Sequence, residues 1–439
     1  MRSIIISSNS SGGGKTTVTL AIMAALKERG YDVQGYKVGP DYIDPAFHRK
    51  ITGKASRNLD IYLMGEDGIQ ESYQRGQGDL GIIEGVMGLY DGKGIDSDCS
   101  TAHVSRCLKL PVILVISPKA QVATLCAEIQ GLRFFEDIEI AGVIFNKVSE
   151  KYYNLLKRAV EENCKGIRVF GYVPKDERIS LESRHLGLVQ SCEVEDLKER
   201  IHKAGELLSQ TVDIDSMIQS FKKAELKDYN NESFHMEKKG IKIAVAYDKA
   251  FSFYYKENIE MMEEVGEVVY FSPLKDKSIP QGTDFIYLGG GYPEVFKEEL
   301  SNNSEMIESI KESLDSGTAC YAECGGLMYL TESIDGFKMV GFLKGSSEMT
   351  GKLNNFGYAE VNVAEENSIL PKGLRIRCHE FHKSVTNCEE DRIYELSKES
   401  YDGTIKNWKC GYIKNNTLAA YAHIHFFSNR EFLRNLIEK

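Results

Sequence analysis

The sequence predicts an α/β protein with two domains. Its 439 residues exceed the about 100–200 residues of an ordinary domain, so two or three domains are expected. Both halves alternate short β-branched runs with helical stretches, a pattern typical of α/β folds. A polar stretch at 223–240, whose few apolar residues repeat at neither helix nor strand spacing, separates the halves. We therefore predict domains at 1–222 and 241–439 joined by a linker at 223–240.

Six apolar runs in the first half are predicted strands of a parallel sheet covered by helices on both faces. They span residues 3–7, 32–37, 80–84, 112–116, 141–145 and 169–173. Their alternation with helical segments predicts a doubly wound domain. A second series of predicted strands follows the linker and indicates a second α/β domain. It comprises residues 242–247, 268–271, 285–288 and 319–322.

The composition is that of a soluble globular protein, with 42% hydrophobic and 27% charged residues. The longest apolar run, at 111–117, is far shorter than the ~18 residues that cross a bilayer, so no membrane partner is expected. The formal charge of −11 repels phosphate backbones, and nucleic acid is therefore not an expected partner. Ten cysteines without a CxxC pair indicate reduced thiols, and we expect a cytoplasmic location.

A glycine-rich loop at 8–17, SNSSGGGKTT, follows the first predicted strand and precedes a helix predicted to begin near Lys15. A phosphate-binding loop requires this order of elements. The glycines let backbone N–H groups turn inward, the lysine supplies a charge, and the first threonine offers a hydroxyl to Mg²⁺. The predicted ATP-binding residues are Gly12, Gly13, Gly14, Lys15, Thr16 and Thr17. The alternative is a glycine-rich turn with a solvated lysine.

This loop departs from the common pattern in two places. Asn9 occupies the position of the first glycine in GxxxxGK[ST], so the loop geometry is expected to differ from the usual one. Switch ATPases of the partitioning type carry a signature lysine where this chain has Ser10. A dimerising nucleotide switch is therefore not expected.

Two segments place carboxylates after predicted strands, YKVGPDYIDP at 36–45 and GIIEGVMGLYDG at 81–92. Ligands of open α/β sheets bind at the carboxyl ends of the strands. The residues predicted to surround the γ-phosphate and its metal are Asp41, Asp44, Glu84 and Asp91. Glu84 is the preferred metal ligand, because an acid at the end of a buried run is costly unless it is paired or metal-bound. The alternative for Glu84 and Asp41 is a helix cap or a salt bridge.

The segment GTACYAECGGLMYL at 317–330 places Cys324 between a predicted strand and a helix that starts near Gly326. A sharp turn there would expose the sulfur as a nucleophile. Backbone N–H groups at the helix start, including that of Gly325, would lower the thiol pKa and hold an oxyanion. Cys320, inside the strand, is predicted to be structural. The alternative is that Cys324 is structural as well.

A thiolate nucleophile needs a base, and the segment AAYAHIHFFSN offers His423 and His425. A spacing of two residues should point both side chains the same way, and we prefer His423, with a core histidine as the alternative. The run YLGGGYPE supplies further oxyanion candidates, which are Gly289, Gly290 and Gly291. The segment RCHEFHKS at 377–384 is interpreted as a loop, because nothing there completes a zinc site.

Ten ordered motifs make the chain resemble, along essentially its full length, the glutamine-dependent corrinoid amidases of the cobyrinate a,c-diamide synthase family. The motifs are SSGGGKTTVTL, YKVGPDYIDP, SRNLD, GIIEGVMGLYDG, DERISLESRHLGLV, AFSFYYKEN, LGGGYPE, ECGG, HEFH and AHIHF. The resemblance implies an N-terminal P-loop domain similar to dethiobiotin synthetase. It also implies a C-terminal class I glutamine amidotransferase domain of α/β type.

In the N-terminal domain, the resemblance adds ligands to the predicted nucleotide site. Asp60 in SRNLD would bind the metal, and Asn146 would read adenine. The metal set then comprises Thr16, Glu84, Asp60 and Asp41. Positions associated with substrate or catalysis are Tyr42, Asp44, Glu84 and Asp91. An anionic substrate needs local basic groups, for which Arg178 and Arg184 are candidates, with surface arginines as the alternative.

In the C-terminal domain, the resemblance implies that Cys324 forms a γ-glutamyl thioester and that His423 activates it. Ordinary class I amidotransferases have a glutamate two residues after this histidine, whereas this chain has His425. Either another group orients the base, or the glutaminase works as a dyad that is slow until the synthetase half is loaded.

The combination predicts that glutamine hydrolysed in the second half supplies ammonia, through an interdomain passage, to an ATP-activated carboxylate in the first half. The resemblance implies amidation of the a and c acetate carboxylates of cobyrinate in cobalamin biosynthesis. Alternatives are the same chemistry on nickel sirohydrochlorin, hydrogenobyrinate or cobyrate, or a nucleotide-dependent switch with a degenerate amidotransferase domain. The expected partners are glutamine, a carboxylated tetrapyrrole and a second copy of the chain in a homodimer.

Overall fold

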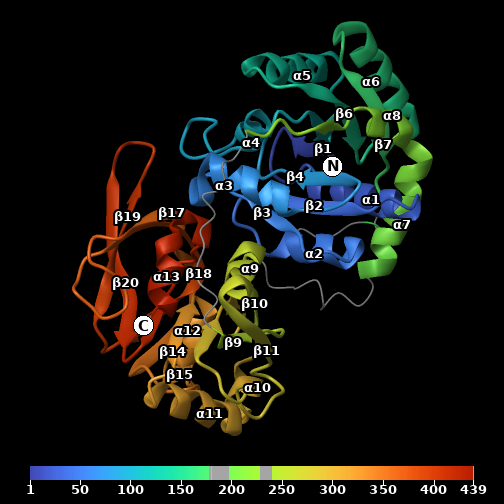
Figure 1. The fold of residues 1–439 in the computed structure, drawn as a ribbon. Helices are drawn as coiled ribbons and strands as arrows, with labels where there is room; N and C mark the ends of the chain where they lie inside the picture. The colour runs from blue at the N-terminus through green and yellow to red at the C-terminus, as the bar shows by residue number, and fades with distance from the viewer. Residues whose placement is uncertain (177–178, 180–196, 228–239, 439) are drawn as a thin grey trace. The chain divides into compact units, whose positions relative to one another are not determined.

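The computed structural model describes residues 1–176, 179, 197–227 and 240–438 (Figure 1). The chain divides into two compact units, Met1–Ile61 with Gly65–Asn230, and Tyr62–Met64 with Asn231–Lys439. The main division thus falls inside the stretch 223–240, while the exact domain limits stay a prediction. Among the described helices, none has both the length and the apolar content that a membrane crossing requires.

The first unit alternates strands and helices along the chain (Figure 1). Its strands are β1 (Arg2–Ser8), β2 (Val33–Val38), β3 (Arg57–Leu59), β4 (Leu80–Glu84), β5 (Val112–Ile116), β6 (Ile140–Asn146), β7 (Arg168–Val173) and β8 (Lys222–Lys223). Its helices are α1 (Lys15–Glu28), α2 (Ile43–Thr52), α3 (Ile61–Arg75), α4 (Thr101–Leu108), α5 (Ala123–Phe135), α6 (Glu150–Asn163), α7 (Leu197–Thr211) and α8 (Ile214–Gln219). All six predicted strands are present, whereas β3 and β8 were not predicted.

The strands of the first unit form one sheet with the order β3-β2-β4-β1-β5-β6-β7. These neighbours are parallel, and β8 adds antiparallel to β1. The register pairs Glu84 of β4 with Ile6 of β1 and with Lys37 of β2. Because parallel strands end at the same edge, the loops after β1, β2 and β4 come together there.

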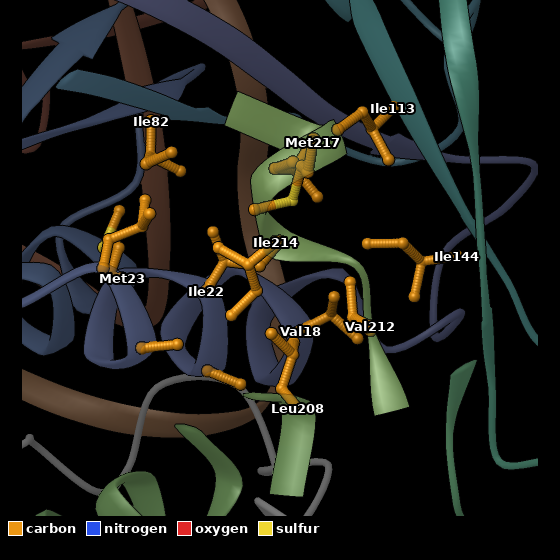
Figure 2. Close-up of a cluster of buried hydrophobic side chains, with 14 of the residues drawn as sticks. Val18, Ile22, Met23, Ile82, Ile113, Ile144, Leu208, Val212, Ile214 and Met217 are labelled. Carbon is orange, nitrogen blue, oxygen red and sulfur yellow. The ribbon is translucent and has the colours of Figure 1, made fainter. Parts of the chain in front are cut away.

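The core of the first unit lies between α1 and the sheet (Figure 2). Val18 and Ile22 of α1 are fully buried and pack in one cluster with Ile82 of β4 and Ile113 of β5. Burying an isoleucine or valine side chain stabilises the fold by about 1.5–3 kcal/mol. The same cluster contains Leu208 of α7, so α1 is held from two sides, and its first residue, Lys15, is held at the sheet edge.

The second unit has a longer series of strands. They are β9 (Ile241–Ala246), β10 (Phe251–Phe253), β11 (Gly266–Phe271), β12 (Phe285–Leu288), β13 (Gly290–Gly291), β14 (Ala319–Glu323), β15 (Ser333–Ile334), β16 (Phe337–Lys338), β17 (Gly345–Val363), β18 (Arg375–Cys388), β19 (Arg392–Glu399), β20 (Ile405–Lys414) and β21 (Thr417–Ala420). The helices are α9 (Lys256–Val265), α10 (Lys297–Asn302), α11 (Ser304–Asp315), α12 (Gly325–Leu330) and α13 (Arg430–Ile437), with a 3₁₀ turn η2 (Phe426–Ser428).

The main sheet of the second unit has a parallel part, β11-β9-β12-β14-β21, as expected for an α/β domain. It continues as an antiparallel part through β20, β19 and β17, and β18 pairs antiparallel with β17. The prediction of a loop at 377–384 was therefore wrong, because His379, Glu380 and His382 lie inside β18. The polar composition of this segment did not indicate a strand, and the strand forms through its long pairing with β17.

Candidate active site

The loop between β1 and α1 has the backbone of a phosphate cradle. Gly14 has a φ of 86°, the left-handed conformation that favours glycine. A Cβ atom on Gly14 would lie 2.0 Å from Nδ2 of Asn146, and one on Gly13 would lie 2.1 Å from Oγ of Ser8. The loop therefore excludes side chains at both positions, and it leads directly into the N-terminus of α1, where the backbone N–H groups favour an anion.

Lys15 is turned toward its own loop. Its Nζ donates to the carbonyl oxygen of Ser10 at 3.3 Å and to that of Met87. Burial, together with the nearby charge of Lys37, lowers the pKa of Lys15 to about 8. A bound anion such as a triphosphate would favour the charged form again, so this lysine fits the predicted phosphate contact.

Thr16 and Glu84 form the direct contact at the centre of this edge. Thr16 Oγ1 donates to Oε1 of Glu84 at 2.6 Å, and the glutamate is completely buried at the end of β4. Hydroxyl and carboxylate oxygens are the ligands that Mg²⁺ prefers. The donor set of these two residues therefore fits the metal that the sequence analysis predicted for them.

Two buried cationic or polar partners of Glu84 were not predicted. Lys37 Nζ lies 3.2 Å from Oε1, and His48 Nε2 lies 2.8 Å from Oε2 while its Nδ1 shares a hydrogen bond of 2.9 Å with Ser56 Oγ. Burial alone would raise the pKa of Glu84, but Lys37 and the hydrogen bonds from His48 and Thr16 keep it below its usual range. Glu84 is thus ionised and is held by neighbours on three sides.

Asp44 joins the same cluster through Lys37, whose Nζ lies 2.6 Å from Oδ2 of Asp44. Burial alone would lower the pKa of Lys37, but Asp44, Glu84 and Asp41 together raise it above its ordinary value. Lys37 therefore stays charged and links two of the predicted carboxylates. Lys37 lies within the motif YKVGPDYIDP, and this position was the feature of the sequence from which its part in the cluster could have been predicted.

The remaining predicted carboxylates have local contacts. Asp41 Oδ1 accepts from the backbone N–H groups of Ile43 at 2.8 Å and Asp44 at 3.1 Å. These contacts at the start of α2 correspond to the helix cap that was the alternative to a metal role for this residue. Asp91 Oδ2 accepts from the N–H of Gly88 at 2.8 Å. Asp60 is buried directly after β3, with β2 between it and β4. In the described part of the chain, no three His, Cys, Asp or Glu side chains gather as a metal cluster, and the metal roles of Asp41 and Asp60 stay predictions.

Asn146, the last residue of β6, braces the phosphate loop. Its Nδ2 donates to the carbonyl oxygen of Gly13 at 3.1 Å, to which Ser117 Oγ also donates at 3.0 Å. Adenine recognition by Asn146 stays a prediction. Two other roles also stay predictions: ATP binding by Thr17, in the first turn of α1, and the substrate or catalytic role of Tyr42, directly before α2.

The two arginines predicted for substrate binding, Arg178 and Arg184, lie outside the described residues.

Cys324 stands at a strained turn between β14 and α12. Its φ of 48° and ψ of −97° are rare for a residue with a side chain, and its N–H donates to the carbonyl oxygen of Ala420 at 2.7 Å. This backbone is that of a sharp strand-to-helix turn, but Cys324 is only 7% exposed, so the expectation of an exposed sulfur was wrong. Helix α12 begins at Gly325, one residue before the predicted start, and Cys320 lies buried inside β14.

The electrostatic expectation for Cys324 was wrong. Burial raises the pKa of its thiol, and the carboxylates of Glu294, Glu380 and Glu323 raise it further. The hydrogen bond from the N–H of Gly325 acts in the opposite direction but does not compensate. A short helix start cannot offset desolvation and several negative charges, so the cysteine rests as a neutral thiol that needs a base.

The predicted oxyanion glycines differ in availability. The N–H of Gly289 donates to the hydroxyl of Tyr254 at 2.8 Å, which argues against its use as an oxyanion donor. Gly290 and Gly291 form β13, which pairs with β10. A Cβ on Gly325 would lie 3.2 Å from the nitrogen of Gly291, so these two glycines are neighbours beside the cysteine turn. The oxyanion roles of Gly290, Gly291 and Gly325 stay predictions.

The two late histidines face different carboxylates. His423 Nδ1 lies 3.8 Å from Oε2 of Glu323, whereas His425 Nε2 lies 3.5 Å from Oε2 of Glu257. The expectation that they point the same way was wrong, because β21 ends at Ala420 and strand alternation does not continue to them. Glu323, which belongs to the quoted motif ECGG, was not among the predicted site residues.

The comparisons with known proteins match a known domain to each of the two units. Family models match residues 4–189, as a CobQ/CobB/MinD/ParA nucleotide binding domain, and residues 242–431, as a CobB/CobQ-like glutamine amidotransferase domain. Together they confirm the predicted fold class. Relatives called cobyrinate a,c-diamide synthase are 61% identical over 443 residues in Clostridium tetani and 61% over 439 residues in Clostridium acetobutylicum, covering 100% of each chain. The chain therefore belongs to the cobyrinate a,c-diamide synthase family.

Proposed function

We propose that the protein is a glutamine-hydrolysing ligase that uses ATP to amidate the a and c acetate carboxylates of cobyrinate in cobalamin biosynthesis. The observation that carries this proposal is the full-length 61% identity to synthases of that name. The phosphate loop of the first unit and the cysteine turn of the second unit provide the two chemistries that such a reaction needs. The alternative macrocycles and the nucleotide switch are not favoured, because the relatives carry the cobyrinate name and the cysteine turn is complete.

In the first unit, the N–H groups of the glycine loop and Lys15 would bind the β and γ phosphates of ATP. Thr16 and Glu84 would hold Mg²⁺, which neutralises charge on the transferred group. A substrate carboxylate oxygen attacks the γ-phosphorus, the bond to the β-phosphate oxygen breaks, and ADP leaves. Ammonia then attacks the carbonyl carbon of the acyl phosphate, the carbon–oxygen bond breaks, and phosphate leaves with formation of the amide.

In the second unit, Cys324 would attack the side-chain amide carbon of glutamine. Because its thiol is neutral at rest, His423 would remove the proton as the sulfur–carbon bond forms and return it to the departing nitrogen. Ammonia leaves, and water hydrolyses the thioester to glutamate. Gly291 and Gly325 lie beside the turn where the oxyanion would develop.

We include three finer points in this proposal. Mg²⁺ is the metal, supported by the oxygen donors of Thr16 and Glu84. The location is cytoplasmic, supported by the nine cysteines in the described part of the chain, none of which forms a disulfide. The assembly is a homodimer, which light scattering of the purified protein would test.

Purified protein incubated with ATP, Mg²⁺, glutamine and cobyrinate tests the main proposal. Mass spectrometry should show two successive replacements of a hydroxyl by an amino group. Parallel incubations with nickel sirohydrochlorin and hydrogenobyrinate should give little product. Amidation of one of these macrocycles in preference to cobyrinate would contradict the substrate assignment.

A further inference from the structure

Glu323 is a buried carboxylate between the cysteine turn and the histidine segment. It is the last residue of β14, directly before Cys324, and is only 1% exposed. The strand register pairs it with Ala420, the last residue of β21, and the chain then continues to His423. Oε2 of Glu323 lies 3.8 Å from Nδ1 of His423. Adjacent parallel strands therefore bring the carboxylate, the thiol and the imidazole to one sheet edge.

Three hydrogen-bond donors hold this carboxylate in place. The hydroxyl of Tyr321 donates to Oε1 at 2.7 Å, and that of Tyr287 donates to Oε2 at 3.1 Å. Burial raises the pKa of both tyrosines well above the ordinary range, so both hydroxyls keep their protons. The N–H of Ile424 donates to Oε1 at 3.1 Å. Because Ile424 follows His423 directly, Glu323 positions the backbone of the histidine segment as well as facing the imidazole.

Two further features place His423. Its backbone forms a bridge with His379, with N–H to carbonyl distances of 2.9 and 3.1 Å. Gly290 leaves room for the ring, because a Cβ there would lie 2.6 Å from Cε1 of His423. A carboxylate on the Nδ1 side keeps the ring proton on that nitrogen and leaves Nε2 as the proton acceptor.

The second buried pair, His425 with Glu257, does not offer a free acceptor. The N–H of Phe427 donates to Nδ1 of His425 at 3.2 Å, which places the ring proton of a neutral imidazole on Nε2. That nitrogen faces Glu257 at 3.5 Å. Nδ1 of His425 thus accepts a hydrogen bond from the turn η2, Nε2 faces a carboxylate of α9, and the pair serves as a matched structural control.

We propose that Glu323 is the positioning residue for His423, in place of the glutamate that ordinary class I amidotransferases carry two residues after the histidine. The inference rests on the proposed glutaminase function. Glu323 itself transfers no proton. His423 takes the thiol proton of Cys324 on Nε2 as the sulfur–carbon bond forms, the carboxylate stabilises the resulting imidazolium, and the proton leaves with the amide nitrogen as ammonia.

The test compares Glu323→Gln, Glu323→Asp and Glu257→Gln in the full-length protein, with either glutamine or an ammonium salt as nitrogen source. We expect Glu323→Gln to lower the glutamine-dependent kcat by about 100-fold, within the range of general-base contributions, with little change in KM for glutamine. Glu323→Asp keeps the charge and should recover part of that loss. Ammonium-driven amidation by all three variants, and the glutamine kcat of Glu257→Gln, should match the wild type.

A second measurement does not depend on the folding of any Glu323 variant. Nitrogen NMR of the wild-type protein with ¹⁵N-labelled histidine, with the His423 signals identified by their loss in His423→Asn, should show the proton on Nδ1. A proton on Nε2 in the resting enzyme would overturn the proposal. So would an unchanged glutamine kcat in Glu323→Gln, or an equal loss in Glu257→Gln. A wild-type protein that forms no amide from either nitrogen source would instead contradict the proposed function.

Discussion

The phosphate loop of the first unit and the cysteine turn of the second both follow a buried parallel strand, and both lead into a helix at a glycine-rich turn. Their electrostatic surroundings differ. Beside the phosphate loop, Lys37 and His48 hold Glu84 in its ionised form. Beside the cysteine turn, burial and three glutamates keep Cys324 protonated. The carboxylate at the first site is therefore ionised at rest, whereas the thiol at the second site must lose its proton before it can act as a nucleophile.

The largest expected effect is that of Cys324→Ala, which should remove one of the two activities and leave the other. Cys324→Ala should abolish glutamine-dependent amidation, because the thioester cannot form, and should leave ammonium-driven amidation intact. Product formation from each nitrogen source, measured by mass spectrometry, checks this. Cys320→Ala, at a buried strand position, is the matched control and should retain glutamine use. Loss of both activities in Cys324→Ala would assign the cysteine a structural role.

Glu84→Gln should act on both nitrogen sources. Removal of the charge weakens the metal and phosphate site that either source requires, and we expect a loss of at least about 100-fold in amidation rate. Steady-state rates with glutamine and with ammonium check this. Glu139→Gln, in an exposed ion pair with Lys222, is the control. Normal ATP-dependent synthesis by Glu84→Gln would remove this residue from the metal site.

His48→Ala tests the support of Glu84 without removing the carboxylate. Residues that orient a metal ligand typically contribute about 10–100-fold to metal affinity or activity, and we expect the Mg²⁺ requirement to rise by that factor. Titration of ammonium-driven activity with Mg²⁺, and calorimetric binding of Mg²⁺ with ATP, measure it. An unchanged Mg²⁺ dependence would show that Lys37 and Thr16 suffice to hold Glu84.

The resting state of Cys324 predicts slow chemical modification. A pKa raised above the ordinary thiol value leaves little thiolate at neutral pH, and the rate of alkylation falls in proportion to the thiolate fraction. Alkylation by iodoacetamide, followed by peptide mass spectrometry, should therefore accelerate only as pH rises well above the usual thiol range. Rapid modification of Cys324 at neutral pH, relative to an unburied cysteine, would show that the turn activates the thiol after all.

Much of both sites could be predicted from local patterns. The order of strand, glycine loop and helix predicted the loop that contains Lys15 and Thr16. The position of Glu84 at the end of a buried run made it a candidate metal ligand. The partners of Glu84 could not be found in this way, because Lys37 and His48 are 47 and 36 residues away in sequence. The polar strand β18 was mistaken for a loop, since its stability depends on pairing with β17.

Residues that are neighbours along the chain were enough to specify the parallel strands, the glycine-rich phosphate loop and the turn at Cys324. The charges at these places arise only once the chain has folded. Burial and the approach of distant side chains set the pKa of Glu84 below its usual range and that of Cys324 above it. The pairing of Glu323 with His423 has the same origin, because a carboxylate and an imidazole so far apart in the sequence meet only when β14 and β21 lie side by side.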